Sequence, residues 1–206
     1  MIRMDTFNFI LCISAVIYST YGDDTGSTLE TKTQNKIVDH HNALRRSVDP
    51  TASDMKKMVW CDPAALNAYN FATQCSMYHS LVEERHIKEP IDVVCGENIY
   101  MSTAKSDWST VIDSWYNERS DFAYGKGKIS DKPIGHYTQV VWAKSYLLGC
   151  AYNFCKENKY PHVFVCHYGP MGNMDESVPR PYEEGEWCAS CPESCDDKLC
   201  DWKPKE

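Results

Sequence analysis

Hydrophobic positions in the first half of the chain recur at the spacing of a helix. One stripe with spacings of i, i+4, i+7 and i+11 predicts an amphipathic helix over residues 34–48, and it consists of Ile37, His41, Leu44 and Val48. A second helix is predicted from Asp62, as its N-cap, to about Met77, with Pro63 at the first helical position. A third follows Ser106 or Asp107 as its cap, and its apolar face consists of Trp108, Val111, Ile112 and Trp115.

The second half of the chain changes to the alternation of apolar and polar residues that is typical of strands. We expect strands over residues 138–142, 149–154 and 162–168, and connecting loops over residues 81–90 and 120–133. Helices that precede antiparallel strands indicate an α+β domain of layered elements, with about 150 residues to bury a core. His136 would lie at the mouth of the first strand, either as a binding or catalytic group or as a hydrogen-bonded core histidine.

The N-terminal end of the chain is typical of an export signal. Arg3 precedes a mostly apolar run over residues 7–17, and small or turn-forming residues follow at 19–22. We therefore interpret residues 1–22 as a signal peptide and residues 23–33 as a flexible lead-in. No second apolar run approaches the roughly 18 residues of a membrane span, so the sequence predicts a secreted, extracellular protein without stable membrane insertion.

The cysteine content and the charge narrow the function classes. Of the 11 cysteines, only Cys12 lies in the predicted signal peptide. The even number that remains in an exported protein predicts five disulfides rather than a zinc finger. The net charge of −8 argues against binding to nucleic acid or to anionic lipid surfaces. No Asn-X-Ser/Thr sequence occurs, so we expect no N-linked glycan.

The composition changes again after Gly169. Residues 170–187 contain three prolines and several acidic residues, so we expect an extended strap there. Four cysteines then fall close together, at positions 188, 191, 195 and 200. A segment so dense in cysteine has little room for a hydrophobic core, and residues 188–206 are interpreted as a small disulfide-rich module.

Two histidines and two glutamates stand beside predicted rigid elements. His79 comes one helical turn after a cysteine, Glu97 comes two residues after another, and Glu118 follows an apolar helix position by three residues. Together with His136 they offer imidazole and carboxylate groups, which are the side chains that bind metals or move protons. Their spacing alone does not show that the four side chains converge.

Three segments carry more specific motifs. Residues 37–46 read IVDHHNALRR, residues 95–101 read CGENIYM, and residues 135–142 read GHYTQVVW. They resemble the signature blocks of the CAP superfamily and, within it, of the cysteine-rich secretory proteins. Residues 165–168, VCHY, and the spacing of the last four cysteines match that family's final core strand and hinge, so the resemblance covers about residues 34–200.

The resemblance implies a domain order and a cleft. A three-layer α-β-α sandwich, the CAP domain, is expected over residues 34–169, followed by the strap at 170–187 and a truncated cysteine-rich hinge at 188–206. In this family a cleft of the CAP domain gathers two histidines and two glutamates, which correspond by motif to His79, Glu97, Glu118 and His136. Neutral imidazoles are good zinc ligands, so a divalent cation is an implied ligand, although the expected function does not require one.

Three interpretations of this cleft stay open: a polar cluster that stiffens the fold, an extracellular metal site, and a metal-dependent hydrolase. The chain has no His-Glu-X-X-His motif. Ser102 and Ser106 lie outside any nucleophile-elbow context. We therefore assign no catalytic residue and expect a protein that is not an enzyme.

The resemblance also implies a set of disulfides, which are Cys75–Cys155, Cys150–Cys166, Cys188–Cys195 and Cys191–Cys200. The family usually has a further core cysteine where this chain has Gly169, and the partner of that cysteine corresponds to Cys95. This chain also carries Cys61, which the family usually lacks. We therefore expect Cys61–Cys95 as a fifth bond, with two free thiols or an intermolecular bond as alternatives.

The resemblance finally indicates a function. Members of the family usually continue with a six-cysteine module that is associated with ion-channel regulation, and this sequence lacks it, so channel blocking is not expected. A truncated member with one hinge resembles the egg-jelly proteins that attract sperm. We expect a secreted signalling protein, a sperm chemoattractant of the egg coat that acts through a sperm-surface receptor. A metal-dependent hydrolase, a sterol or lipid carrier, and a weak homodimer stay open.

Overall fold

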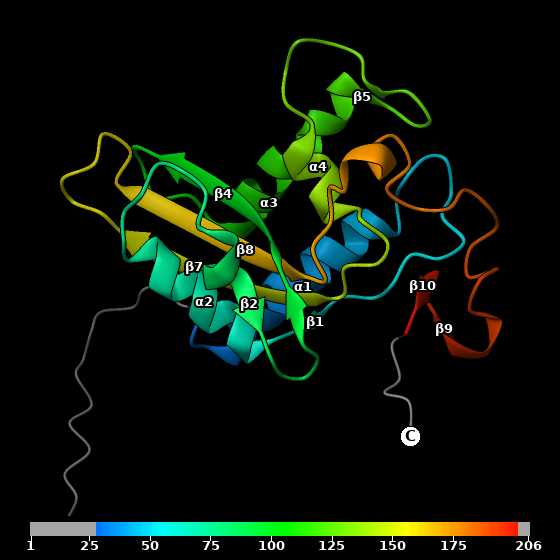
Figure 1. Cartoon of the computed structure of the whole chain (residues 1–206), viewed down its shortest axis with the longest axis horizontal. Coiled ribbons are helices and arrows are strands. Elements are labelled where there is room, and N and C mark those ends of the chain that lie inside the picture. The colour runs from blue at the N-terminus through cyan, green and yellow to red at the C-terminus, as the bar shows by residue number, and fades with distance from the viewer. Residues whose placement is uncertain (1–27, 202–206) are drawn as a thin grey trace, which may run out of the picture.

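The computed structural model describes residues 28–201. Its centre is a four-stranded sheet with the strand order β1-β7-β8-β4 (Figure 1). β4 (Gly96–Ser102) and β7 (Leu147–Phe154) lie antiparallel on either side of β8 (His162–Gly169), and the short β1 (Val59–Trp60) pairs with β7 in parallel. The strands predicted at 149–154 and 162–168 are therefore confirmed.

Helices cover both faces of this sheet. α1 (Thr31–Arg45) and α3 (Trp108–Tyr116) pack on one face, and α2 (Asp62–Ala72) packs on the other (Figure 1). Consecutive residues of β8 consequently face different layers, with Phe164 in the core on the side of α1 and α3 and Val165 in the core beneath α2. This arrangement is a three-layer α-β-α sandwich and confirms the predicted fold class.

The N-terminal boundaries differ slightly from the prediction. α1 begins at Thr31, inside the predicted lead-in of residues 23–33, and ends at Arg45 rather than at residue 48. The predicted signal peptide of residues 1–22 lies outside the described residues. No helix within residues 28–201 combines the length and the apolar character that crossing a bilayer requires.

α2 begins close to the predicted position but is shorter. Its N-cap is Cys61, one residue before the predicted cap, and it ends at Ala72 instead of near residue 77. The chain leaves the helix through a turn in which Cys75 has a φ of 55°, in the left-handed region. α2 also packs very closely on β7, because a Cβ atom on Gly149 would collide with the backbone nitrogen of Ala65.

α3 matches its prediction in detail. Asp107 is the N-cap, and its Oδ1 accepts a hydrogen bond from the backbone nitrogen of Thr110 at 3.0 Å. The whole predicted apolar face is buried, namely Trp108, Val111, Ile112 and Trp115. The cap and the 3.6-residue period therefore defined this element correctly.

The strand predicted over residues 138–142 is wrong. The segment is instead a short helix, α4 (Gly135–Val140), with His136 in its first turn. A strand in this position would alternate buried and exposed residues, yet consecutive positions of α4 are buried, and they are Tyr137, Thr138, Gln139 and Val140. Thr138 Oγ1 donates to the carbonyl oxygen of Ile134 one turn earlier, at 3.1 Å. Short apolar runs do not separate buried helices from strands, and tertiary packing decided this one.

The two predicted loops contain short regular pieces. Within residues 81–90, the 3-10 helix η1 (Val82–Arg85) leads into β2 (His86–Ile87), which pairs with β3 (Val93–Val94). After α3, a second 3-10 helix, η2 (Asn117–Asp121), leads into a hairpin. The strands of this hairpin are β5 (Phe122–Ala123) and β6 (Gly127–Lys128).

The strap and the hinge are docked firmly on the body. Within the strap, which contains the 3-10 turn η3 (Asp175–Ser177), the carbonyl oxygen of Pro181 accepts a hydrogen bond from the Ala143 nitrogen at 2.8 Å. The hinge consists of η4 (Pro192–Ser194), β9 (Cys195–Asp196) and β10 (Leu199–Cys200). Leu199 is fully buried in the main hydrophobic core, so the cysteine-dense module shares the core of the CAP domain.

One buried cation holds α1 to the segment before β7. Arg45 is fully buried and donates six hydrogen bonds to backbone carbonyl oxygens, which belong to Lys56 (twice), Val140, Trp142, Ala143 and Ser145. The flat, five-donor guanidinium suits such a ring of acceptors. Arg45 therefore positions the C-terminal end of α4 and the loop that follows it.

Among residues 28–201, four disulfides are formed, and they are Cys75–Cys155, Cys150–Cys166, Cys188–Cys195 and Cys191–Cys200. The predicted Cys61–Cys95 bond is wrong for this structure, because both cysteines are free and buried. They belong to one small hydrophobic cluster with Ala64, Ile87, Tyr146 and Leu147. Each thiol packs there as a small apolar group. The expected fifth bond followed only from the pairing of the other eight cysteines, which does not show that the remaining two are bonded to each other.

Candidate functional site

Glu97, the second residue of β4, is the centre of a buried hydrogen-bond network. Its Oε1 accepts hydrogen bonds from His79 Nδ1 at 2.7 Å and from the backbone nitrogen of Ser80 at 3.0 Å. Its Oε2 accepts from Ser80 Oγ at 2.7 Å and from His167 Nε2 at 3.0 Å. The register of β4 and β8 places Glu97 directly opposite His167. The sheet therefore fixes the carboxylate, and the carboxylate holds the loop that carries His79.

This network keeps Glu97 ionised and His167 neutral. Burial alone would raise the pKa of Glu97, but the hydrogen bonds from His167, His79 and Ser80 outweigh it and hold that pKa well below its ordinary value. Burial lowers the pKa of His167, against the opposing effect of Glu97. A neutral His167 that donates from Nε2 leaves Nδ1 as an acceptor, and this buried atom has no hydrogen-bond partner among the described residues.

A second carboxylate, Glu118 of η2, holds His136. Its Oε1 accepts a hydrogen bond from His136 Nδ1 at 2.7 Å, and its Oε2 accepts from the backbone nitrogens of His136 at 2.8 Å and Tyr137 at 3.2 Å. Burial would raise the pKa of Glu118, but the hydrogen bond from His136 and the further donors lower it. The His136 ring also stacks on Trp115, with ring centres 6.3 Å apart. Both the backbone and the ring of His136 are thus fixed.

Asn98 connects the two His–Glu pairs. It follows Glu97 on β4, and its Nδ2 donates to the carbonyl oxygen of His136 at 3.1 Å and to the hydroxyl of Tyr168 at 3.3 Å. That hydroxyl lies 3.0 Å from His41 Nε2 of α1. The two pairs are therefore attached to consecutive residues of a single strand.

The four predicted site residues form the pairs His79–Glu97 and His136–Glu118. Within residues 28–201, no three His, Cys, Asp or Glu side chains are arranged so that they could hold a metal ion. Each histidine uses Nδ1 for its glutamate, so Nε2 is the ring atom that is left for a ligand. This chemistry leaves each imidazole one ring atom for a cation, with the orientation of the ring fixed by its glutamate. It does not fit a site with four protein ligands.

Sequence reasoning missed three members of this network: Ser80, Asn98 and His167. Asn98 and His167 lie inside the motifs CGENIYM and VCHY, so the signal was present. Their roles depend on the pairing of β4 with β8, which places residues 97 and 167 side by side. A local sequence pattern does not show which residues of two distant strands lie opposite each other.

An apolar groove lies between α2 and the segment that begins α1. It has a volume of about 520 Å³ and is lined by Thr28, Leu29, Gln34, Asp62, Ala65, Leu66, Tyr69 and Tyr152. Leu66 and Tyr69 are 59% and 53% exposed, so this helix presents large apolar side chains to the groove. The groove is separate from the two His–Glu pairs.

The family model described as "CAP: Cysteine-rich secretory protein family" matches residues 38–168. Among curated proteins, allurin of Xenopus tropicalis is 64% identical over 202 residues, covering 98% of this chain and 99% of allurin. Cysteine-rich secretory protein 3 of Homo sapiens is 47% identical over 175 residues, covering 84% of this chain and 70% of that protein.

Solved structures agree with the fold. The crystal structure of NaASP2 with Zn²⁺ is similar with a TM-score of 0.66 and 31% identity, and the match covers 86% of this chain and 98% of that one. The hookworm platelet inhibitor has a TM-score of 0.62 at 23% identity, covering 92% of this chain and all (100%) of that one, and supports the fold alone.

Proposed function

Since the chain belongs to the cysteine-rich secretory protein (CAP) family, we propose that it is a secreted signalling protein, a sperm chemoattractant of the egg coat that binds a sperm-surface receptor. The observation that carries this proposal is the 64% identity to allurin, which extends over 98% of the chain. The match extends over nearly the full length of both sequences, the hinge included. The resemblance of the sequence motifs to egg-jelly attractants and the similarity of the full chain to allurin thus favour the same class of protein.

The geometry of the two His–Glu pairs does not favour hydrolysis. Both histidines are hydrogen-bonded through Nδ1 to glutamates, which orients them but leaves no carboxylate positioned as a separate base. Ser80 Oγ donates to the Glu97 carboxylate and not to an imidazole, an arrangement that does not activate a hydroxyl for attack. We therefore assign the His–Glu pairs a structural role, outside the contact with the receptor.

The receptor is tested by binding to living cells. Labelled protein comprising residues 23–206 is expected to bind sperm of the producing species saturably, and excess unlabelled protein should displace it. A His79→Ala/His136→Ala variant with a native circular dichroism spectrum is expected to displace the label equally well. Binding that never saturates would contradict a receptor. A folded double variant that fails to compete would instead place the cleft at the receptor contact and overturn our assignment of the histidines.

A second activity, the binding of a divalent cation, is proposed for the same cleft, with zinc as the first candidate. The supporting observation is that both rings are held at Nδ1 by carboxylates, which leaves Nε2 as the metal-binding atom. When bound, the cation would supply Lewis acidity. His79 and His136 would hold it, and Glu97 and Glu118 would set the ring orientations.

Calorimetric titration with zinc at neutral pH tests this proposal. The His79→Ala and His136→Ala variants should each lose the binding heat seen with the wild type. His86 is a matched control, because its Nε2 is paired with the exposed Asp92 outside the cleft. Equal zinc binding by His79→Ala and His86→Ala would show that the metal sits elsewhere.

The alternative of a sterol or lipid carrier draws support from the groove on α2. Its volume of about 520 Å³ lies in the range of small-molecule sites, roughly 300–1,000 Å³. A fluorescent sterol or fatty acid that binds in the groove should not bind to the Leu66→Asp variant. The Phe154→Asp variant, which places the same charge at an exposed position outside the groove, should bind it as the wild type does. Equal binding by both variants would exclude the groove.

A further inference from the structure

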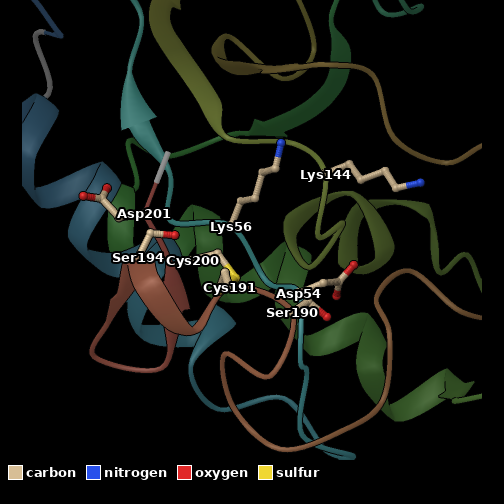
Figure 2. Close-up of a pocket in the computed structure, with 8 residues that line it drawn as sticks. All are labelled: Asp54, Lys56, Lys144, Ser190, Cys191, Ser194, Cys200 and Asp201. Carbon is tan, nitrogen blue, oxygen red and sulfur yellow. A yellow bond between two sulfur atoms is a disulfide. The ribbon is translucent and has the colours of Figure 1, made fainter. Parts of the chain in front are cut away.

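A second pocket lies where the hinge meets the CAP domain, away from the His–Glu pairs. It has a volume of about 500 Å³, and its lining residues are Asp54, Lys56, Lys144, Ser190, Cys191, Ser194, Cys200 and Asp201 (Figure 2). Its walls come from three stretches of chain that are far apart in sequence. The proposed signalling function assigns no role to any of these residues.

Backbone hydrogen bonds make this pocket a rigid part of the fold. The Lys56 nitrogen donates to the Ala143 oxygen at 3.2 Å, and the Lys57 nitrogen donates to the Cys200 oxygen at 2.9 Å. The Cys200 nitrogen donates in turn to the Met55 oxygen at 2.8 Å. The segment around Lys56 is therefore clamped between body and hinge. Because Lys144 directly follows Ala143, the first of these bonds brings the two lysines to the same wall.

Lys56 and Lys144 differ from the other cations near the hinge in their ion pairing. Lys57 pairs with Asp196 and Arg46 with Asp197, so neighbouring cations are neutralised by the hinge. Among residues 28–201, neither Lys56 nor Lys144 has an ion pair within salt-bridge distance. The pocket lining therefore holds two ammonium groups that no salt bridge neutralises, together with the carboxylates of Asp54 and Asp201.

The proximity of the lysines is also seen in their electrostatics. Burial lowers the pKa of Lys56 and the charge of Lys144 lowers it further, whereas the charge of Asp54 raises it. The Lys56 ammonium lies 4.7 Å from the centre of the Tyr146 ring. An anionic group on a ligand in this pocket would be attracted by both positive charges.

The other walls of the pocket carry hydroxyl and carboxylate groups. Figure 2 shows Asp54 and Ser190 close together on one side, and Ser194 and Asp201 on another, with both lysine side chains extending away from the Cys191–Cys200 disulfide. Carboxylates and serine hydroxyls accept hydrogen bonds from sugar hydroxyls. They would also repel a second anionic group on the ligand.

We propose that this pocket binds a saccharide that carries one anionic group, a carboxylate or a sulfate. Lys56 and Lys144 bind the anion, and Asp54, Ser190, Ser194 and Asp201 bind the hydroxyls. The volume of about 500 Å³ suits a ligand of one to a few sugar rings rather than a single carboxylate side chain. The carboxylates on the walls select against polyanions. This inference goes beyond the proposed function and does not depend on it.

The ligand chemistry is tested by titrating the protein of residues 23–206 with defined probes, followed by calorimetry or ligand-observed NMR. The probes are 3′-sialyllactose, 3′-sulfolactose, neutral lactose, acetate and the peptide Gly-Glu-Gly. We expect saturable binding of one or both acidic sugars, at least about tenfold tighter than binding of lactose, acetate or the peptide. The two acidic sugars distinguish a carboxylate from a sulfate. Equal binding of lactose, or a preference for the peptide, would overturn the proposal.

The location is tested with charge-matched variants. Lys56→Gln/Lys144→Gln should weaken binding of the preferred sugar by at least about tenfold, because two charge-assisted hydrogen bonds are lost. Lys88→Gln/Lys156→Gln makes the same change in net charge at exposed positions outside the pocket and should change affinity by less than about twofold. Lys144 is exposed, so Lys144→Gln alone serves if the double variant is unstable. Equal effects of the pocket and control variants would place the sugar elsewhere.

Discussion

At the scale of single residues, Glu97 is the group on which the buried hydrogen-bond network depends. Its carboxylate accepts four hydrogen bonds, from His79, Ser80 (twice) and His167. We expect Glu97→Gln to lower the free energy of unfolding at neutral pH by about 2 kcal/mol, because an amide cannot accept all four. Urea unfolding measures this loss, with the exposed Glu157→Gln as the control that should change little.

The same residue predicts a pH dependence. The folded-state pKa of Glu97 lies below its unfolded value of about 4.3, so its stabilising contribution is present above that pH and is lost as the pH falls. The wild type should therefore lose stability between about pH 5 and pH 3 more steeply than Glu97→Gln does. Parallel pH profiles for the two proteins would show that Glu97 is not held in its ionised form.

The two buried cysteines give a second prediction at this scale. Burial raises the pKa of the Cys95 thiol to about 12 and also raises that of Cys61. Both should remain protonated and unreactive towards a thiol reagent in the native protein, and both should react after unfolding without reductant. Reaction with the native protein, or no reactive thiol after unfolding, would contradict the two free and buried thiols described above.

How far the sequence could predict the site is clearest at His79 and His136. Their residue types and motifs identified them together with Glu97 and Glu118, but the division into two separate pairs follows from the fold. Ser80 and His167 join Glu97 only because β4 and β8 pair in one register. Such contacts join residues about 70 positions apart, and no local pattern in the chain records them.

At the scale of elements, Arg45 shows how one side chain positions several segments. It donates six hydrogen bonds to carbonyl oxygens at the end of α4, after it and before β1. Arg45→Met should lower the free energy of unfolding by about 3 kcal/mol or more, because these buried carbonyls lose their donors. Arg46→Met is the matched control, since Arg46 is partly exposed and pairs with Asp197 on the surface. Equal losses in chemical denaturation would contradict the role of Arg45.

The elements with a clear period were predictable, and the short buried one was not. α3 was defined by its cap at Asp107 and its apolar face, both of which are local features. α4 has only six residues, and most of them are buried, so its short apolar sequence was interpreted as a strand and shows no helical period. α2 is shorter than predicted because the chain turns at Cys75 after the helix. The left-handed backbone conformation of Cys75 could not be predicted from the local sequence.

At the scale of the whole molecule, the hinge is an integral part of one folded body. Leu199 lies in the main core, and backbone hydrogen bonds join Met55 and Lys57 to Cys200. A receptor would therefore meet the body, the strap and the hinge as one rigid surface. This surface also contains the junction pocket at Lys56 and Lys144.

The central claim is that the folded protein directs the movement of sperm. The most direct measurement is the tracking of sperm of the producing species in a microfluidic gradient of the purified protein, compared with the same mean concentration applied uniformly. We predict net migration up the gradient, no net direction in the uniform field, and loss of the response after the disulfides are reduced and alkylated. Sperm that show no directional bias at any concentration of the native protein would contradict the account.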